Sequence, residues 1–93
     1  MSTAGRPSLT ESYAVLRRAE AARTASRRMI ARGERPGYRV EVVRTAPDIA
    51  VRIVELPWLS GSAPSMRDVT ATGRRLVADW LEVPPGAFDI EVA

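Results

Sequence analysis

The stretch from residue 66 to 92 constrains the fold most, because it combines a helical pattern, an enforced stop and a terminal strand. Apolar residues recur there at the three- and four-residue spacing of a helix with one buried face, which predicts a helix from Met66 to Leu81 or Glu82. Pro84 and Pro85 then prevent further helix, since proline lacks the amide donor. The last residues, FDIEV, alternate apolar and acidic and predict an amphipathic strand. The predicted buried helix face comprises Met66, Val69, Thr72 or Gly73, Leu76, Val77, Trp80 and Leu81.

Two earlier runs predict a hairpin on which this helix can pack. Residues 38–44 and 49–56 alternate between apolar and polar side chains, as do strands of a sheet that has one solvent-exposed face. The turn residues at 45–48 favour antiparallel pairing of these runs. Residues 60–65, SGSAPS, fit either a loop or a short edge strand, because proline at 64 is tolerated only at an edge.

A long helix rich in arginine and alanine precedes the hairpin. It is predicted from Leu9 to Ala31 or Arg32. Ser8 and Glu11 have the spacing of a capping box at its start, and Gly33 is expected to end it in the left-handed conformation. Its apolar stripe consists mostly of small residues, which bury little area. The helix is therefore expected either to pack weakly on its own domain or to pack closely against a partner.

Together these elements predict an α+β fold. We expect a small antiparallel sheet of three or four strands covered by one helix and preceded by the arginine-rich helix. The 93 residues are enough for one domain. The expected organisation is a disordered N-terminus at 1–8, a basic helix at 9–33 and an α+β domain at 38–93.

All 14 basic residues are arginine, and they are unevenly distributed. Up to Arg39, nine arginines stand against three glutamates, which gives a net charge of +6. From Val40 onward, five arginines stand against eight carboxylates, which gives −3. A basic segment of this kind is typical of contact with nucleic acid or with an acidic surface.

Seven residues are candidates for binding. Arg17, Arg28 and Arg32 share one helix face, because eleven residues make close to three turns. That face can be simply solvated, contact a partner or a second copy, or bind phosphates. The candidates for nucleic acid or an acidic partner are Arg17, Arg18, Arg28, Arg32 and Arg35. Trp58 and Trp80 are predicted at the core or its edge, or alternatively as interface anchors.

The composition argues against catalysis. The chain has no histidine and no cysteine, so it lacks the commonest general base, the commonest metal ligand and all thiol chemistry. No ordinary base is present to activate Ser60 or Ser62, and no phosphate-loop or metal motif occurs. We expect a protein that is not an enzyme and uses no cofactor or metal. No apolar run suits a membrane span or a signal peptide, so a cytoplasmic location is expected.

Three segments resemble the HicB-like antitoxin family: Glu55-Leu56-Pro57, Leu76-Val77-Ala78-Asp79-Trp80-Leu81 and Phe88-Asp89-Ile90-Glu91-Val92. The likeness covers about residues 38–92 and is greatest to short actinobacterial members. It implies a partial double-stranded-RNA-binding-like fold with two or three antiparallel strands, one helix and a closing strand. It also implies a protein partner, since full members bind and block a small RNA-cleaving toxin and often repress their own operon. Two departures are expected: the usual C-terminal DNA-binding segment is missing, and the arginine-rich helix is added.

The sequence therefore predicts a non-catalytic HicB-like binding module, antitoxin-like or regulatory, that acts through protein–protein contacts. Two alternatives remain open. One is a nucleic-acid-binding regulator that uses the arginine-rich helix. The other is an oligomeric adaptor, such as a homodimer, that associates through that helix.

Overall fold

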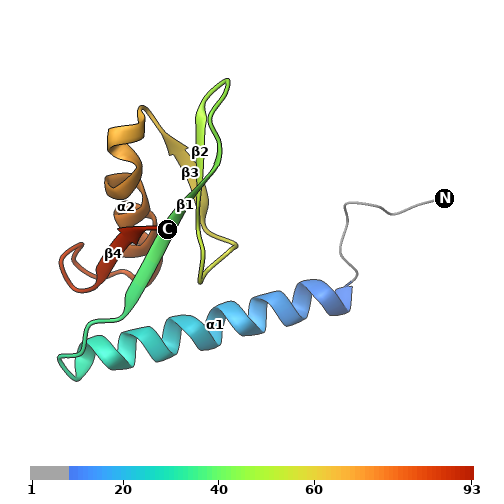
Figure 1. The fold of residues 1–93 in the computed structure, drawn as a ribbon. Coiled ribbons are helices and arrows are strands. Elements are labelled where there is room, and N and C mark those ends of the chain that lie inside the picture. Colours follow the sequence, from blue (N-terminus) through green and yellow to red (C-terminus); the bar gives the residue numbers. More distant parts are fainter. Residues whose placement is uncertain (1–8) are drawn as a thin grey trace.

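The computed structural model describes residues 9–93, with side chains from residue 12 onward. Its elements are α1 (Leu9–Ala31), β1 (Gly37–Arg44), β2 (Ile49–Ile53), β3 (Ser60–Ala63), the 3-10 turn η1 (Met66–Asp68), α2 (Val69–Leu81) and β4 (Asp89–Val92). The predicted disorder at 1–8 and the predicted capping box of Ser8 and Glu11 lie outside the described residues. Figure 1 shows α2 on one face of the sheet and α1 crossing one end of both, with its N-terminal half extending past the strands.

The α+β class and the four strands are confirmed, but the expectation of an antiparallel sheet is wrong for one pair, because the sheet is mixed. The strand order is β3-β2-β1-β4. The β1–β2 and β2–β3 pairs are antiparallel, whereas β4 runs parallel to β1, with Tyr38 opposite Ile90. The parallel pair is possible because α2 crosses over the sheet between β3 and β4, and a helical crossover is the usual connection to a parallel neighbour. Residues 60–63, whose sequence fits either a loop or a short edge strand, form the edge strand β3.

The core lies between α2 and one sheet face. Tyr38 and Phe88 meet edge to face there, with ring centroids 5.9 Å apart and planes at 79°. The largest fully buried side chains are Phe88, Ile53, Leu81, Val40, Val51, Val69 and Val77. The alternation in the two long strands and the helical spacing of the predicted 66–81 segment therefore identify most of this core.

Two sequence predictions are wrong in detail. The second strand ends at Ile53 rather than Leu56, because the chain turns and Leu56 donates its amide to the Ile53 carbonyl at 3.2 Å. The turn places Leu56 in the core and Glu55 outside it. Met66 was expected on the buried helix face but is 58% exposed, because it lies in η1 ahead of α2.

The helix ends follow the sequence signals closely. Gly33 has φ +81° and ends α1 in the left-handed conformation, as predicted. α2 stops at Leu81, because Glu82 itself is left-handed (φ +58°) and donates its amide to the Ala78 carbonyl. The helix therefore ends before Pro84, and the prolines only prevent its resumption.

Gly73 marks the closest approach between α2 and the sheet. A Cβ atom at this position would lie 2.8 Å from Val40 Cβ, 3.0 Å from Val40 Cγ2 and 3.3 Å from Ile90 Cδ1. Val40 is fully buried in β1, so its Cβ cannot move aside without moving the strand. Glycine in mid-helix, which costs about 1 kcal/mol relative to alanine, is thus explained by tight packing.

We expect Gly73→Ala to lower the free energy of unfolding by up to about 2 kcal/mol, because overpacking of about 1–3 kcal/mol outweighs the gain of about 1 kcal/mol in helix propensity. Urea titration monitored by circular dichroism measures this. Gly37→Ala is the control, since its Cβ would meet nothing within 4 Å. Stabilisation by Gly73→Ala would contradict the tight contact.

Candidate functional site

Two arginines fasten α1 to the C-terminal end of α2. Arg23 Nε donates to the Trp80 carbonyl at 2.8 Å, and its Nη2 lies 2.9 Å from Glu82 Oε1. Arg27 Nη1 donates to the Leu81 carbonyl and lies 3.7 Å from the same Glu82 oxygen. Carbonyls in the last turn lack intrahelical partners and carry the negative end of the helix dipole. The two guanidinium groups therefore supply hydrogen-bond donors to the free carbonyls of the last turn of α2. These contacts also fix the point at which α1 crosses α2.

A buried polar contact adds to this attachment. The Ser26 hydroxyl hydrogen-bonds to the Tyr38 hydroxyl, and both residues are buried. Burial raises the pKa of Tyr38, the hydrogen bond with Ser26 opposes this, and the nearby charge of Glu55 adds to it. Tyr38 thus remains neutral at physiological pH. All these contacts lie at or beyond residue 23 of α1. Among the side chains described, from residue 12 onward, those that hold α1 to the body by hydrogen bonds and ion pairs therefore belong to its C-terminal half.

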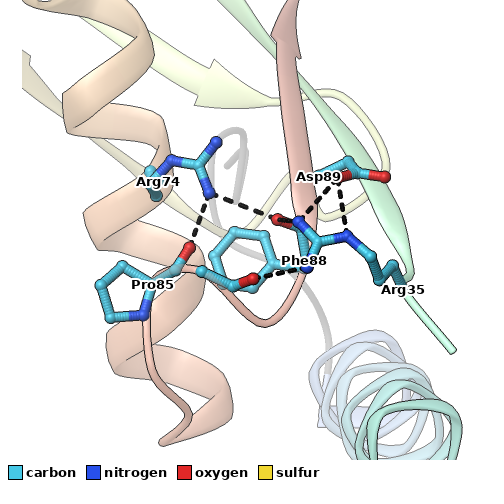
Figure 2. A network of polar contacts seen from close by, with 6 residues as sticks. Arg35, Arg74, Pro85, Phe88 and Asp89 are labelled. Carbon is cyan, nitrogen blue, oxygen red and sulfur yellow. Dashed lines mark hydrogen bonds and ion pairs between the residues drawn. The ribbon is translucent and has the colours of Figure 1, made fainter. Parts of the chain in front are cut away.

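Arg35, one of the predicted binding residues, is occupied within the chain (Figure 2). It donates to the Gly86 carbonyl at 2.6 Å and the Phe88 carbonyl at 3.0 Å, and twice to Asp89 Oδ1 at 3.0 and 2.8 Å. Arg74, from α2, reaches the same connection through the Pro85 carbonyl at 2.6 Å and the Phe88 carbonyl at 3.3 Å (Figure 2). The two arginines hold the path from α2 into β4.

The other four predicted arginines lie along α1 and just after it. Arg32 makes two hydrogen bonds with Glu34, at 3.0 and 3.3 Å, and its hydrogen bonding and charge lower the pKa of Glu34. Arg17, Arg18 and Arg28 are exposed, and within residues 12–93 no ion pair joins them to a carboxylate. Arg17 also lies 6.0 Å from the Tyr13 ring centroid. The five predicted arginines therefore do not act as one cluster.

The predicted tryptophans lie together at the edge of the core and border a groove. The Trp58 and Trp80 ring centroids are 5.8 Å apart with planes at 59°, and both residues are half-buried. Trp58 Nε1 is buried and has no hydrogen-bond acceptor among the described side chains and backbone. Beside Trp58 lies a groove of about 650 Å³ between α1 and the β2–β3 connection. This Trp58 groove is lined by Val15, Arg18, Ala22, Glu55, Pro57 and Trp58.

The carboxylate on the rim of the groove is already neutralised. Arg39 donates its Nε to Glu55 Oε2 at 2.7 Å and its backbone amide to Oε1 at 2.8 Å. Partial burial by itself raises the pKa of Glu55, but the hydrogen bonds from Arg39 and its charge outweigh burial and lower the pKa. Glu55 is thus ionised, with both oxygens occupied.

The sheet face opposite α2 is not covered by the described elements, and it ends at free edges (Figure 1). It carries the ion pairs Arg39–Glu55 at 2.7 Å and Arg52–Glu41 at 2.9 Å. At the β4 edge, the amides of Asp89 and Ala93 bond to carbonyls of Pro36 and Val40. Since alternate residues of a parallel strand bond to opposite sides, residues 90 and 92 direct their backbone groups to the free edge.

Within the described residues, no group of three or more acidic, histidine or cysteine side chains could hold a metal ion. Among the helices described, none has both the length and the apolar character needed to cross a membrane. Comparison with family models, with curated proteins and with solved structures finds no match to this chain.

Sequence reasoning missed Arg23, Arg27 and the Trp58 groove. Ser26 lies on the predicted apolar stripe of the helix, Arg23 comes three residues before it, and Arg27 is the next residue. Helical spacing alone therefore places both arginines near the α+β domain. Nothing in the sequence indicates that the end of α2 meets them, because that contact spans more than fifty residues.

We expect the double variant Arg23→Gln/Arg27→Gln to release α1. Each charged hydrogen bond to a carbonyl contributes about 1 kcal/mol at a partly exposed site, so amide hydrogen exchange in α1 should accelerate about tenfold or more. NMR of the backbone amides measures it. Arg17→Gln/Arg28→Gln removes the same charge without removing a contact to α2, and equal acceleration in this control would refute the attachment.

Proposed function

We propose that the chain is a non-catalytic binding module of the HicB-like antitoxin kind, which blocks a small RNA-cleaving toxin by covering its surface. The observation that carries this proposal is the uncovered sheet face with its free β4 edge. The element order adds support, because three antiparallel strands, a helix and a closing strand are what the resemblance implies.

The β4 edge offers a way to bind. The outward backbone groups at residues 90 and 92 can pair with an extended strand of the partner, which adds a strand to the sheet. Glu91 is exposed on the uncovered face at this edge, whereas Asp89 is already paired with Arg35. A toxin that binds RNA carries basic groups for the phosphates, and carboxylates complement such a surface. The edge would thereby occupy the surface that RNA needs.

This function predicts inhibition by the intact chain. The test requires a small RNA-cleaving toxin encoded beside this chain, and the measurement is cleavage of a fluorescent RNA by that toxin as the chain is added. We expect Glu91→Arg to raise the inhibitory concentration about tenfold, as reversal of one interface charge does. Val92→Pro should also raise the inhibitory concentration about tenfold. It removes the backbone amide that points to the free edge and leaves the hydrogen bonds between β4 and β1 in place.

Asp79→Arg is the matched control, since Asp79 is an exposed carboxylate on α2, away from the β4 edge. It should leave inhibition unchanged. If the wild-type chain neither inhibits cleavage nor forms a complex by light scattering, the antitoxin proposal fails.

A nucleic-acid-binding regulator is the second candidate, favoured by the exposed Arg17, Arg18 and Arg28 on α1. Three phosphate contacts predict that affinity for a labelled duplex falls about 40-fold between 50 and 200 mM salt, from a slope of about −0.9 per contact. Fluorescence anisotropy measures it. Replacing the three arginines by glutamine should abolish the salt dependence, and absence of binding at 50 mM salt would exclude this candidate.

A further inference from the structure

We propose that the Trp58 groove is a docking site for a short acidic segment of a partner protein that carries a large apolar side chain. The groove goes beyond the proposed function, because it lies between α1 and the β2–β3 connection and not at the β4 edge.

The floor of the groove is apolar and large enough for such a side chain. Val15 and Ala22 come from α1, and Pro57 and Trp58 come from the facing connection. Its volume of about 650 Å³ falls within the roughly 300–1,000 Å³ of protein pockets that hold ligands. Ala22 is a small residue in the α1 wall, and Val15 in the same wall is 40% exposed.

The arginines around the groove favour a partner segment that carries carboxylates. Arg18 lies on its rim and also borders a shallow hollow on the outside of α1, together with Arg17, Ala14 and Ala21. A segment that leaves the groove across α1 would therefore meet both guanidinium groups in turn. Glu55, the acid of the rim, does not oppose this, because both its oxygens already accept hydrogen bonds from Arg39.

Other occupants fit less well. A second copy that offered its own α1 would bring Arg17 and Arg18 against the same arginines, and like charges across an interface weaken it. A nucleic acid would have no apolar group for the floor beyond its bases. Base stacking would engage Trp58 alone, since Val15, Ala22 and Pro57 offer no aromatic ring for a second base.

The probe is a fluorescein-labelled peptide of sequence DELFED, with both ends blocked, titrated with the full chain at 50 mM salt and followed by anisotropy. We expect saturable binding. The peptides DESGED, without the apolar pair, and KKLFKK, with reversed charge, should bind at least tenfold more weakly. Arg18→Glu should weaken binding of DELFED about tenfold, and Trp58→Ala by a similar factor.

Arg28→Glu is the matched control, because it makes the same change in net charge on the outer face of α1, away from the groove. It should change affinity less than twofold. Should Trp58→Ala fail to fold, Arg18→Glu still decides the question, since Arg18 is exposed. Inhibition of the toxin by Arg18→Glu should equal that of the wild type, so failure at the groove and failure at the β4 edge are distinguishable.

Four outcomes would overturn the proposal. One is no saturable binding of DELFED up to 1 mM chain. Another is equal weakening by Arg18→Glu and Arg28→Glu, which would mean general attraction to a basic helix. A third is displacement of the peptide by a 20-base-pair duplex whose own affinity falls equally in Arg18→Glu and Arg28→Glu. That result would mean that α1 binds phosphates. The fourth is a doubled mass in light scattering that Arg18→Glu returns to one chain, which would place a second copy in the groove.

Discussion

The close contact of α2 with the sheet at Gly73 is the constraint on which the other contacts depend. With no Cβ at that position, the helix approaches Val40 in β1 and Ile90 in β4 at once. This approach buries Val77 and Leu81 and fixes the position of the last turn of α2. The carbonyls of that turn are what Arg23 and Arg27 bind, so the sheet positions α1 indirectly, through α2.

Some arginines of this chain bind its own backbone carbonyls, and others are exposed to solvent. The local structure around each arginine decides between these two roles. Arg23, Arg27, Arg35 and Arg74 each reach backbone carbonyls at a helix end or in a connection, where a planar group with several donors can satisfy more than one acceptor. Arg17, Arg18 and Arg28 stand where the described chain offers no such carbonyl. The net charge of the N-terminal segment therefore overstates the charge available to a partner.

Local patterns predicted the elements well, and long-range contacts account for what they missed. Alternation and helical spacing located β1, α2 and β4, and Gly33 marked the end of α1. The early end of β2 and the parallel direction of β4 depend on tertiary packing, in which Leu56 enters the core and α2 crosses the sheet. Among the candidate residues, Trp58 and Trp80 were placed at the edge of the core, whereas the internal role of Arg35 depends on a connection fifty residues away.

The one-sided attachment of α1 has a mechanical consequence. Among the described side chains of α1, Arg23 makes the polar contact with the body that lies nearest the N-terminus, and Val15 lies eight residues before it, about 12 Å along the axis. A rod clamped at one end deflects most at the other, and a small rotation at Arg23 becomes a larger displacement at Val15. Bending of α1 about Arg23 would therefore change the width of the groove at Val15 without any change in the sheet, because the opposite wall, with Trp58, packs against the core.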